Sequence, residues 1–415
     1  MWKIVYRFFS YLFLIPGILF LHRNEKTKGT IRERLIPPQK SQTENQTVWI
    51  HAASIGEAII AIAIKEFLTS KKKLSFVVTT NTIYAKDLLK RELGEEVQIC
   101  YAPLDVKFSV RSFMRGHNFR ALLLIETELW PNMIWEAKRT GVPVLILNGR
   151  ISDRTFPIYR KISFFMKDVL SSIDFVLAQS ELHAERFRYL GVKKDRIRVM
   201  GNIKYLRRIE ITDDMKDKKN IVTFGSVRSG EKRTVLEVIE QVKVNYPYIT
   251  FFVAPREFSV ISELAKSLGE RFRLGYFSAI KEKSLDPLNF DVVIVDTVGD
   301  LPQIYRKSLL AFVGGSLIPH GGHNILEPLF FGTPVLFGPY IENFKDLSED
   351  IMANGAGAMV KDQEELRKMV EMIITDDSLR KSMANNGWTL IKKKKDEIEK
   401  ELEVIFEFIN KGGMF

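Results

Sequence analysis

Residues 47–57 have the sequence TVWIHAASIGE, an apolar run followed by a turn of small residues and a carboxylate. The run Thr47–Ala53 is apolar on both faces, which is typical of a strand in a parallel sheet that is covered by helices on both sides. Gly56 permits a tight turn, and Glu57 falls at the start of the amphipathic stretch that follows. This order of strand, turn and helix predicts a doubly wound α/β domain.

The same alternation continues toward the C-terminus. Short apolar runs separated by longer amphipathic stretches occur at Leu74–Thr80, Val97–Ala102, Ala121–Ile125, Val142–Leu147 and Phe175–Ala178. It pauses at the polar stretch 207–220, which we interpret as a linker. A second series follows at Ile221–Phe224, Ile249–Ala254, Asp291–Val295, Leu309–Val313, Pro334–Phe337 and Ala358–Val360. Two Rossmann-like domains in tandem are therefore expected.

The length of 415 residues agrees with two domains of ordinary size. We expect an N-terminal membrane-anchor helix (1–22), a Rossmann-like domain (23–206), a linker (207–220), a second Rossmann-like domain (221–390) and a closing helix (391–415). The closing helix is predicted from helical spacing in Ile391–Ile409, and its basic cluster Lys392–Lys395 is more typical of a solvated face than of a binding site. The carboxyl edges of the two sheets should face one another across a cleft, the usual ligand position in such folds.

Composition limits the classes of partner. Apolar residues make up 46% and charged residues 27% of the chain, which excludes a disordered chain or one that spans the membrane many times. The net charge of +11 favours contact with phosphates on nucleotides, nucleic acid or anionic lipid. Nucleic acid is not expected, because the basic residues show no interleaved aromatic pattern. Cys100 is the only cysteine, so an internal disulfide is excluded, and its apolar run predicts a buried strand position.

The N-terminal segment Trp2–Leu21 is apolar, but Lys3 and Arg7 interrupt it and Pro16-Gly17 is expected to break it. The stretch between Arg7 and His22 would reach about 21 Å as a helix, less than the roughly 30 Å of a hydrocarbon core. We expect an anchor on the cytoplasmic face of the inner membrane, and the alternative is a helix docked on the protein's own core. A basic collar follows, made of Arg23, Lys26, Lys28, Arg32 and Arg34.

Carboxylates follow two of the predicted strands. Glu57 lies at a predicted helix N-terminus, where the helix dipole stabilises its charge, and it is a candidate general base. The alternative is a glutamate that only offsets the dipole. Glu126 and Glu128 flank Thr127 directly after another apolar run, and the pattern does not separate their roles. Acidic residues at the end of a strand, near the start of a helix, are more indicative of a catalytic role than an acidic pair on the surface is.

Glycine-rich turns follow strands of the second domain. Residues 313–316 (VGGS) and 320–328 (HGGHNILEP) would let backbone amides approach a phosphate, at a helix that begins near Asn324. The spacing fits neither a P-loop nor a dinucleotide-binding motif. Glu327 could accept hydrogen bonds from ribose hydroxyls. His320 and His323 could ligate a metal, but the loop offers no convincing third ligand.

Two more turns, at 225–231 and 254–257, end strands of the same domain. Arg256 stands where its guanidinium could hold a phosphate with two hydrogen bonds. A single arginine at such a place is more often solvated. Several such loops at one predicted sheet edge favour a binding function.

Taken together, these blocks resemble the bacterial Kdo (3-deoxy-D-manno-oct-2-ulosonic acid) transferases of lipopolysaccharide assembly. The similarity runs in order from the N-terminal segment to about Asp346. It is carried by residues 49–57, 126–132, 148–152, 201–204, 298–300, 314–328 and 338–346.

The resemblance implies a GT-B fold with two facing Rossmann-like domains, of which the first binds the acceptor and the second the CMP sugar. It also implies transfer of Kdo from CMP-Kdo to the lipid A precursor, with inversion and without a metal or other cofactor. By position, Glu57 resembles the base, and Glu126 and Lys204 resemble groups that support the transition state. The implied donor-binding residues are Pro255, Arg256, Val298, Gly299, Asp300, Asn324, Ile325, Leu326 and Glu327.

Two positions depart from the family pattern: Arg228 stands in place of histidine in the turn 225–231, and Gly149 stands in place of alanine. Two rival hypotheses stay open. One is a two-domain transferase that uses another nucleotide sugar. The other is a membrane-associated nucleotide-binding protein without activity, which has no need of Glu57, Glu126 and Lys204 together. The number of Kdo residues added does not follow from the sequence.

Overall fold

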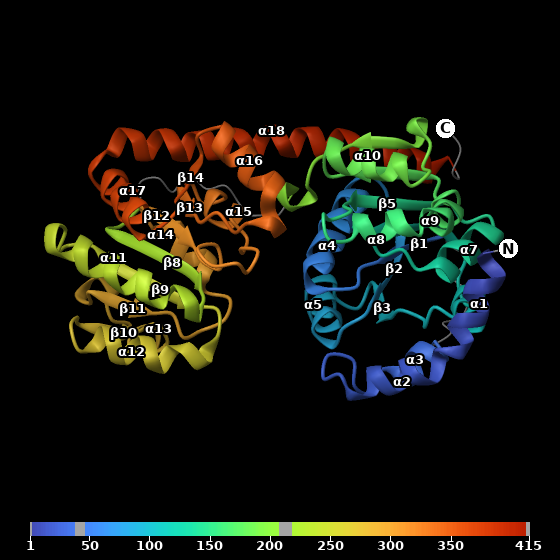
Figure 1. Ribbon diagram of the computed structural model, residues 1–415, viewed down its shortest axis with the longest axis horizontal. Coiled ribbons are helices and arrows are strands. Elements are labelled where there is room, and N and C mark those ends of the chain that lie inside the picture. The colour runs from blue at the N-terminus through green and yellow to red at the C-terminus, as the bar shows by residue number, and fades with distance from the viewer. Residues whose placement is uncertain (1, 38–45, 207–217, 412–415) are drawn as a thin grey trace. The chain divides into compact units, whose positions relative to one another are not determined.

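The computed structural model describes residues 2–37, 46–206 and 218–411. The chain divides into two compact units, Met1–Arg208 with Lys395–Phe415 (unit 1) and Ile209–Lys394 (unit 2). Each unit contains a seven-stranded parallel sheet with helices on its faces (Figure 1). The predicted α/β class with two Rossmann-like sheets is therefore confirmed. Most of the predicted linker, residues 207–217, lies outside the described residues.

The sheet of unit 1 has the strand order β3-β2-β1-β4-β5-β6-β7. Each of the six apolar runs predicted for this half overlaps a strand. The strand bounds are β1 (Thr47–His51), β2 (Ser75–Thr80), β3 (Gln98–Tyr101), β4 (Phe119–Ile125), β5 (Val144–Gly149), β6 (Phe175–Ala178) and β7 (Ile197–Val199). The order reverses between β1 and β4, which is where ligands bind in doubly wound sheets. Cys100 is buried in β3 as predicted, and burial raises the pKa of its thiol to about 12.

Helices pack on the unit 1 sheet around a core that contains Trp49, Phe113 and Phe187. Their bounds are α4 (Ile55–Lys71), α5 (Ile83–Leu93), α6 (Lys107–Arg115), α7 (Pro131–Arg139), α8 (Phe156–Lys161), α9 (Ser163–Leu170) and α10 (Glu181–Tyr189), with the 3-10 turns η1 (Lys194–Arg196) and η2 (Ile203–Leu206).

The N-terminal segment forms α1 (Trp2–Leu12), α2 (Leu14–Arg23) and α3 (Ile31–Leu35), and α1 lies along α7 (Figure 1). The break falls at Phe13 and not at Pro16-Gly17 as expected, because Pro16 lies in the first turn of α2, where no intrahelical N–H bond is needed. Among the described residues no single helix is long and apolar enough to cross a membrane. The pair α1 and α2 meets that test together, with a bend of 52° between them.

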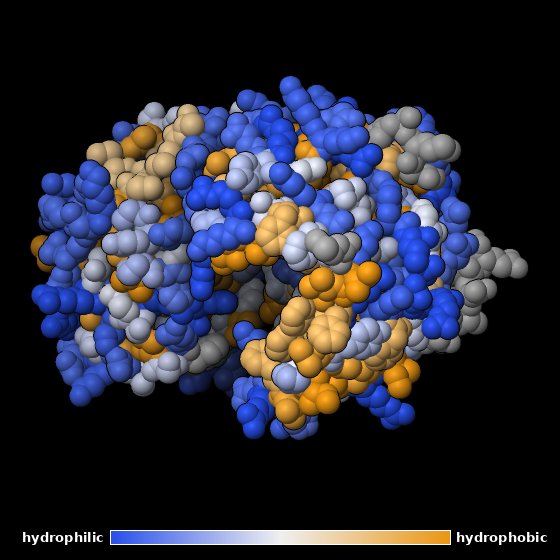
Figure 2. Space-filling model, turned by 45° about the vertical axis from the view of Figure 1, so that its right-hand side comes forward, coloured by the Kyte–Doolittle hydropathy of each residue, from blue (hydrophilic) through white to orange (hydrophobic). Residues whose placement is uncertain are grey.

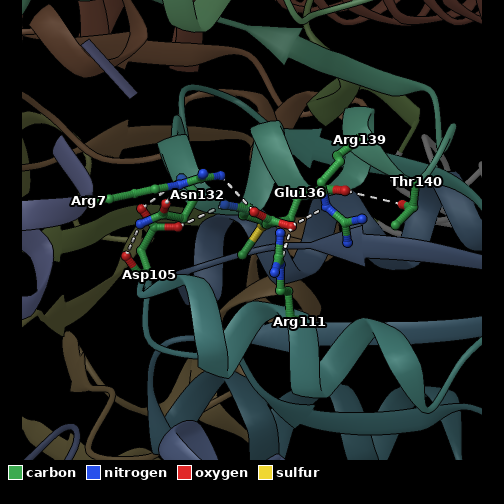
Figure 3. A network of polar contacts seen from close by, with 8 residues as sticks. Arg7, Asp105, Arg111, Asn132, Glu136, Arg139 and Thr140 are labelled. Carbon is green, nitrogen blue, oxygen red and sulfur yellow. Dashed lines mark hydrogen bonds and ion pairs between the residues drawn. The ribbon is translucent and has the colours of Figure 1, made fainter. Parts of the chain in front are cut away.

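Helix α1 docks on the core through its polar side chains. Tyr6 donates to Asp105 (2.9 Å), and Arg7 pairs with the buried Glu136 (2.6 Å). Glu136 also accepts from Arg111 and Arg139 (Figure 3). Burial opposes the ionisation of Glu136, but the two hydrogen bonds outweigh it and hold its pKa below the usual range. Docking on the protein's own core, the alternative to a free anchor, is thus observed.

The other side of α1 and α2 remains exposed. Figure 2 shows apolar surface gathered where these helices lie, and its exposed side chains include Ile4, Phe8 and Leu19. One member of the predicted basic collar, Arg34, is not on the protein surface. Arg34 is 4% exposed and donates to Thr30 and Asn81, so it is a structural residue and cannot reach a head group.

Unit 2 has the strand order β10-β11-β9-β8-β12-β13-β14. Its strands are β8 (Ile221–Val227), β9 (Thr250–Pro255), β10 (Leu274–Tyr276), β11 (Val292–Ile294), β12 (Leu310–Val313), β13 (Val335–Phe337) and β14 (Gly357–Met359). Its helices are η4 (Ser229–Glu231), α11 (Lys232–Asn245), η5 (Phe258–Val260), α12 (Ile261–Gly269), α13 (Phe277–Glu282), η6 (Pro287–Asn289), α14 (Leu301–Lys307), α15 (Leu326–Leu329), η7 (Glu342–Phe344), α16 (Lys345–Ala353) and α17 (Gln363–Thr375).

The closing helix α18 (Asp377–Asn410) begins earlier than Ile391. Its part from Lys395 onward belongs to unit 1. There Glu403 pairs with Lys71 (2.5 Å), and the ring of Phe408 contacts that of Phe175. One helix thus contributes residues to both units.

Candidate active site

The first group of candidate residues lies where β1 ends and α4 begins. Ser54 caps α4 by accepting from the N–H of Glu57 (3.4 Å). The Glu57 carboxylate in turn accepts from Ala53 N–H (2.7 Å) and from the Ser54 hydroxyl (2.8 Å). These reciprocal bonds resemble a capping box, and they fix the carboxylate at the carboxyl edge of the sheet.

Glu57 is only 8% exposed. Burial, and next the charge of Glu128, raise its pKa to about 8 although the bonds from Ala53 and Ser54 oppose the shift. A carboxylate in this environment accepts a proton far more readily than a solvated one does. A pKa close to the working pH is what a general base requires.

The two carboxylates after β4 occupy different environments. The strand ends at Ile125, and Glu126 adopts a left-handed backbone conformation (φ 59°). Asn148, at the end of the neighbouring strand β5, has the same φ of 59°. Its side-chain amide approaches Glu126 at 3.5 Å, the limit of a hydrogen bond. Such conformations are uncommon for residues other than glycine and concentrate at functional sites.

Glu128 lies next to Trp130 and His51. The indole N–H of Trp130 donates to it (2.8 Å), and His51 Nε2 lies 3.7 Å away. Burial raises the pKa of Glu128, but these two neighbours outweigh it, and the pKa lies below its usual range. Glu128 therefore stays ionised while Glu57 holds its proton more tightly. A pair of carboxylates whose pKa values are pushed apart is the usual basis for separate acid and base roles.

Lys204 comes to the same place from η2. Asn148 Oδ1 accepts from the N–H of Ile203 (3.0 Å), which ties this segment to the end of β5. Burial lowers the pKa of Lys204, and the charge of Glu126 opposes that shift. The three residues predicted for catalysis, Glu57, Glu126 and Lys204, thus lie in one electrostatically coupled group within unit 1.

The glycine-rich turn after β12 differs from the expected phosphate cradle. The carboxylate of Glu231, which is buried, accepts from the N–H groups of Gly315 (2.7 Å), Ser316 (3.0 Å) and Leu317 (3.0 Å). These amides therefore hold a carboxylate of the protein and are not available to a phosphate. In the second part of the loop, His320 N–H donates to Ile318 O (2.7 Å) and Gly322 N–H to Gly315 O (2.9 Å), so residues 321 and 323–325 remain the candidates for anion binding.

Basic side chains gather beside this loop. Arg228 donates from Nε to His323 Nε2 (3.2 Å) and pairs with Glu257. Burial, and next the charges of Arg228 and Arg256, lower the pKa of His323 to about 4, so the imidazole is neutral and accepts the bond. Because Nε2 is taken up by Arg228, His323 is a poor metal ligand. Within the described ranges no group of three or more His, Cys, Asp or Glu could hold a metal ion.

Apart from Pro255 and Arg256 at the end of β9, the predicted donor residues fall into two places, one after β11 and one after β12. Asn324 Oδ1 accepts from Leu326 N–H (3.2 Å), but the helix expected there is only the four-residue α15, so its dipole is small. Asp300 pairs with Lys281 (3.0 Å) after β11, and nearby Val298 is 84% exposed. Since β9 and β8 separate β11 from β12, the two places lie about 14 Å apart along the sheet edge.

Comparison with known proteins decides the family. Residues 29–207 match the family model described as 3-deoxy-D-manno-octulosonic-acid transferase (kdotransferase). The 3-deoxy-D-manno-octulosonic acid transferase of Haemophilus influenzae is 30% identical over 381 residues, which cover 88% of this chain and 88% of that protein. The chain belongs to the Kdo transferase family. It is therefore a glycosyltransferase.

Two further comparisons bear on the architecture of this Kdo transferase. A bifunctional glycosyltransferase/methyltransferase of Fusobacterium nucleatum is 32% identical over 84% of this chain, but the chain spans only 56% of that relative's length. A solved glycosyltransferase structure from Rickettsia africae matches 89% of this chain and all (100%) of that one, with a TM-score of 0.60 and 14% identity. That likeness supports the GT-B fold alone.

Some residues of the candidate site were given no role from the sequence. Asn148 had a usable signal, because an Asn-Gly pair directly after a strand favours a left-handed backbone. Glu231 had none for its role in this loop, since the three loop amides that it binds lie more than 80 residues away. Arg228, the departure from the family pattern, is held by Glu257 and His323 and so lies beside the candidate donor loop.

Proposed function

We propose that the protein transfers Kdo from CMP-Kdo to a sugar hydroxyl of the lipid A precursor, with inversion at the anomeric carbon, in lipopolysaccharide core assembly. The observation that carries the proposal is the buried Glu57 with a pKa of about 8 beside the ionised Glu128. The family relationship supports the chemistry, and the unit 1 site supplies a base of suitable strength.

In the proposed step, Glu57 takes the proton of the acceptor hydroxyl as the hydroxyl oxygen forms a bond to the anomeric carbon of Kdo. The bond from that carbon to the phosphate oxygen breaks, and its electron pair leaves with CMP. Attack from the face opposite the leaving group inverts the anomeric carbon. The Lys204 ammonium balances negative charge at the Kdo carboxylate or the departing phosphate, and Glu126 holds that ammonium by its own charge.

The donor is assigned to the carboxyl edge of the unit 2 sheet. Arg256 is the proposed phosphate ligand, and the loop 320–325 contributes backbone amides. Residues 298–300 and Glu327 are assigned to the nucleoside. No metal is needed in this scheme, because positive side chains take the charge of the leaving phosphate.

We place the enzyme at the cytoplasmic face of the inner membrane. The exposed apolar side of α1 and α2 supports this placement, together with the four remaining basic residues of the collar, Arg23, Lys26, Lys28 and Arg32.

The test is CMP release from CMP-Kdo with and without lipid A precursor, in the presence of a chelator. Glu57→Gln keeps the shape of the side chain and is expected to lower acceptor-dependent release about 1000-fold, within the range of general-base effects. Glu92→Gln, on the exposed side of α5, is the matched control. Product mass counts the Kdo residues added. If the wild type releases no CMP, the donor is another nucleotide sugar or the protein is a binder only.

A further inference from the structure

An open groove of about 420 Å³ lies between the N-terminal helices and the carboxyl edge of the unit 1 sheet. Phe13, Leu14 and Leu21 line one wall, and Leu104, Trp130 and Met133 line the other. Nothing in the catalytic scheme above uses this space. Its walls are mostly apolar, so it is suited to a hydrocarbon ligand.

The polar residues in the walls are already satisfied by the protein. Arg34 donates to Thr30 (2.9 Å) and to Asn81 (3.1 Å). The Asp105 carboxylate accepts from Tyr6 (2.9 Å) and from the N–H of Met133 (2.9 Å). These groups therefore need no partner from a ligand, and the groove presents apolar surface to whatever enters it.

Trp130 connects the groove to the acidic group. Trp130 lines the groove, and its indole N–H donates to Glu128 (2.8 Å). The charge of Glu128 in turn acts on Glu57. The lining residues Asn81 and Ala102 directly follow β2 and β3, so the groove opens at the same sheet edge as the candidate base.

We propose that this groove holds a fatty acyl chain of the acceptor and so positions the acceptor's sugar hydroxyl at Glu57. The inference rests on the proposed transfer to a lipid-linked sugar. The contact of Trp130 with Glu128 favours the acceptor's own chain over the tail of a membrane lipid, because the groove wall is also part of the acidic site. Each methylene buried in such a groove improves affinity about fourfold, which corresponds to ~0.8 kcal/mol.

Gly17 provides a direct test. It lines the groove, and a Cβ added there would meet nothing within 4 Å. Gly17→Phe should therefore fill the groove without disturbing α2, whose helicity benefits from the loss of a glycine. Ile15→Phe is the matched control. Ile15 is 70% exposed and lies two positions away, on a different side of the helix and outside the groove lining.

The measurement is transfer to a fully acylated precursor and to its deacylated sugar. We expect Gly17→Phe to raise KM for the acylated acceptor at least tenfold while kcat changes less than threefold. Its kcat/KM for the deacylated sugar should equal that of the wild type, and Ile15→Phe should match the wild type on both. Circular dichroism and thermal unfolding confirm that both variants fold.

Two results would overturn the inference. One is an unchanged KM of Gly17→Phe for the acylated acceptor. The other is weaker binding of Gly17→Phe to phospholipid vesicles that hold no acceptor, which would assign the groove to membrane tails.

If the wild type transfers to neither acceptor, the proposed function fails. Calorimetric binding of the acylated precursor to wild type and to Gly17→Phe in detergent then still tests the groove. A tenfold weaker affinity of the variant would support it, and equal affinities would refute it.

Discussion

Glu57 is subject to opposing electrostatic effects. Its place in the first turn of α4 and its bonds from Ala53 and Ser54 favour the ionised form. Burial and the nearby charge of Glu128 favour the neutral form, and they prevail, because the pKa is raised to about 8. The same residue therefore caps a helix and retains the basicity that proton transfer requires.

This balance predicts the pH dependence of the reaction. A base must be deprotonated to act, so kcat/KM of the wild type should rise with pH and level off above about pH 8. Glu128→Gln removes one of the two main causes of the raised pKa, so the rise should move to lower pH. The profile is measured with CMP release at saturating donor, and Glu92→Gln should leave it in place. A rise at the same pH in Glu128→Gln would contradict the coupling.

The raised pKa also predicts a change in stability. Between the ordinary value of 4.5 and about 8, the folded protein keeps a proton on Glu57 that the unfolded chain has lost. This contribution is therefore complete below about pH 4.5 and disappears as the pH rises through 8. Glu57→Gln lacks this dependence, so its unfolding free energy relative to wild type should increase by a few kcal/mol from pH 5 to pH 9. Denaturant titrations at both pH values measure this change, and a constant difference would argue against a neutral Glu57.

At the scale of elements, the central strands could be predicted because they are buried on both faces and form continuous apolar runs. The edge strands β7 and β10 could not. Each has only three residues, and Arg198 and Gly275 interrupt their apolar pattern. The early start of α18 was hidden by an Asn-Asn-Gly sequence at 385–387, which favours turns when it is considered alone. Packing on unit 2 overrides that preference, as Met383 is part of its core.

The candidate catalytic residues could be predicted from the sequence, but their contacts could not. Glu57, Glu126 and Lys204 were predictable as residues, but the contacts of Asn148 with Glu126 and with Ile203 N–H join segments far apart in sequence. Likewise, Arg34 was assigned to a basic collar because its partner Asn81 lies 47 residues away. Sequence patterns record local spacing, whereas these contacts arise only when strands and helices are brought together.

The glycine loop of unit 2 depends on one carboxylate. Glu231 accepts from three consecutive loop amides and from Arg228 N–H (3.0 Å). Glu231→Ala would leave these donors without an acceptor, and we expect a loss of at least ~3 kcal/mol in unfolding free energy and weaker CMP binding. Glu231→Gln keeps one acceptor oxygen, so its unfolding free energy and its CMP affinity should lie between those of the wild type and of Glu231→Ala.

Denaturant unfolding and calorimetric CMP titration measure these effects. Glu263→Gln, on the neighbouring helix α12, removes an exposed carboxylate and serves as the control. Equal stability of Glu231→Ala and the control would show that the loop does not rely on this carboxylate.

At the scale of the whole molecule, unit 1 depends on the C-terminal part of α18 for its core. Residues 395–410 complete unit 1, where Ile398, Leu402 and Ile405 are buried. A chain that stops after Lys394 should therefore lose stability in unit 1 while unit 2 keeps its unfolding temperature. Each buried aliphatic side chain contributes roughly 1.5–3 kcal/mol, so the loss should exceed that of any single core substitution.

Differential scanning calorimetry tests this prediction, with CMP used to identify the transition of unit 2. Leu402→Ala in the full chain should lower the same unit 1 transition by a smaller amount. A drop confined to the CMP-sensitive transition would contradict the division of α18 between the units.

The shared helix also sets an order of events during synthesis. The ribosome must add residues 207–394 before the segment that completes unit 1 exists, which takes roughly 10–40 s at bacterial and eukaryotic elongation rates. The apolar side of α1 and α2 leaves the ribosome long before that. The nascent chain therefore exposes this apolar surface before the last segment of unit 1 has been made.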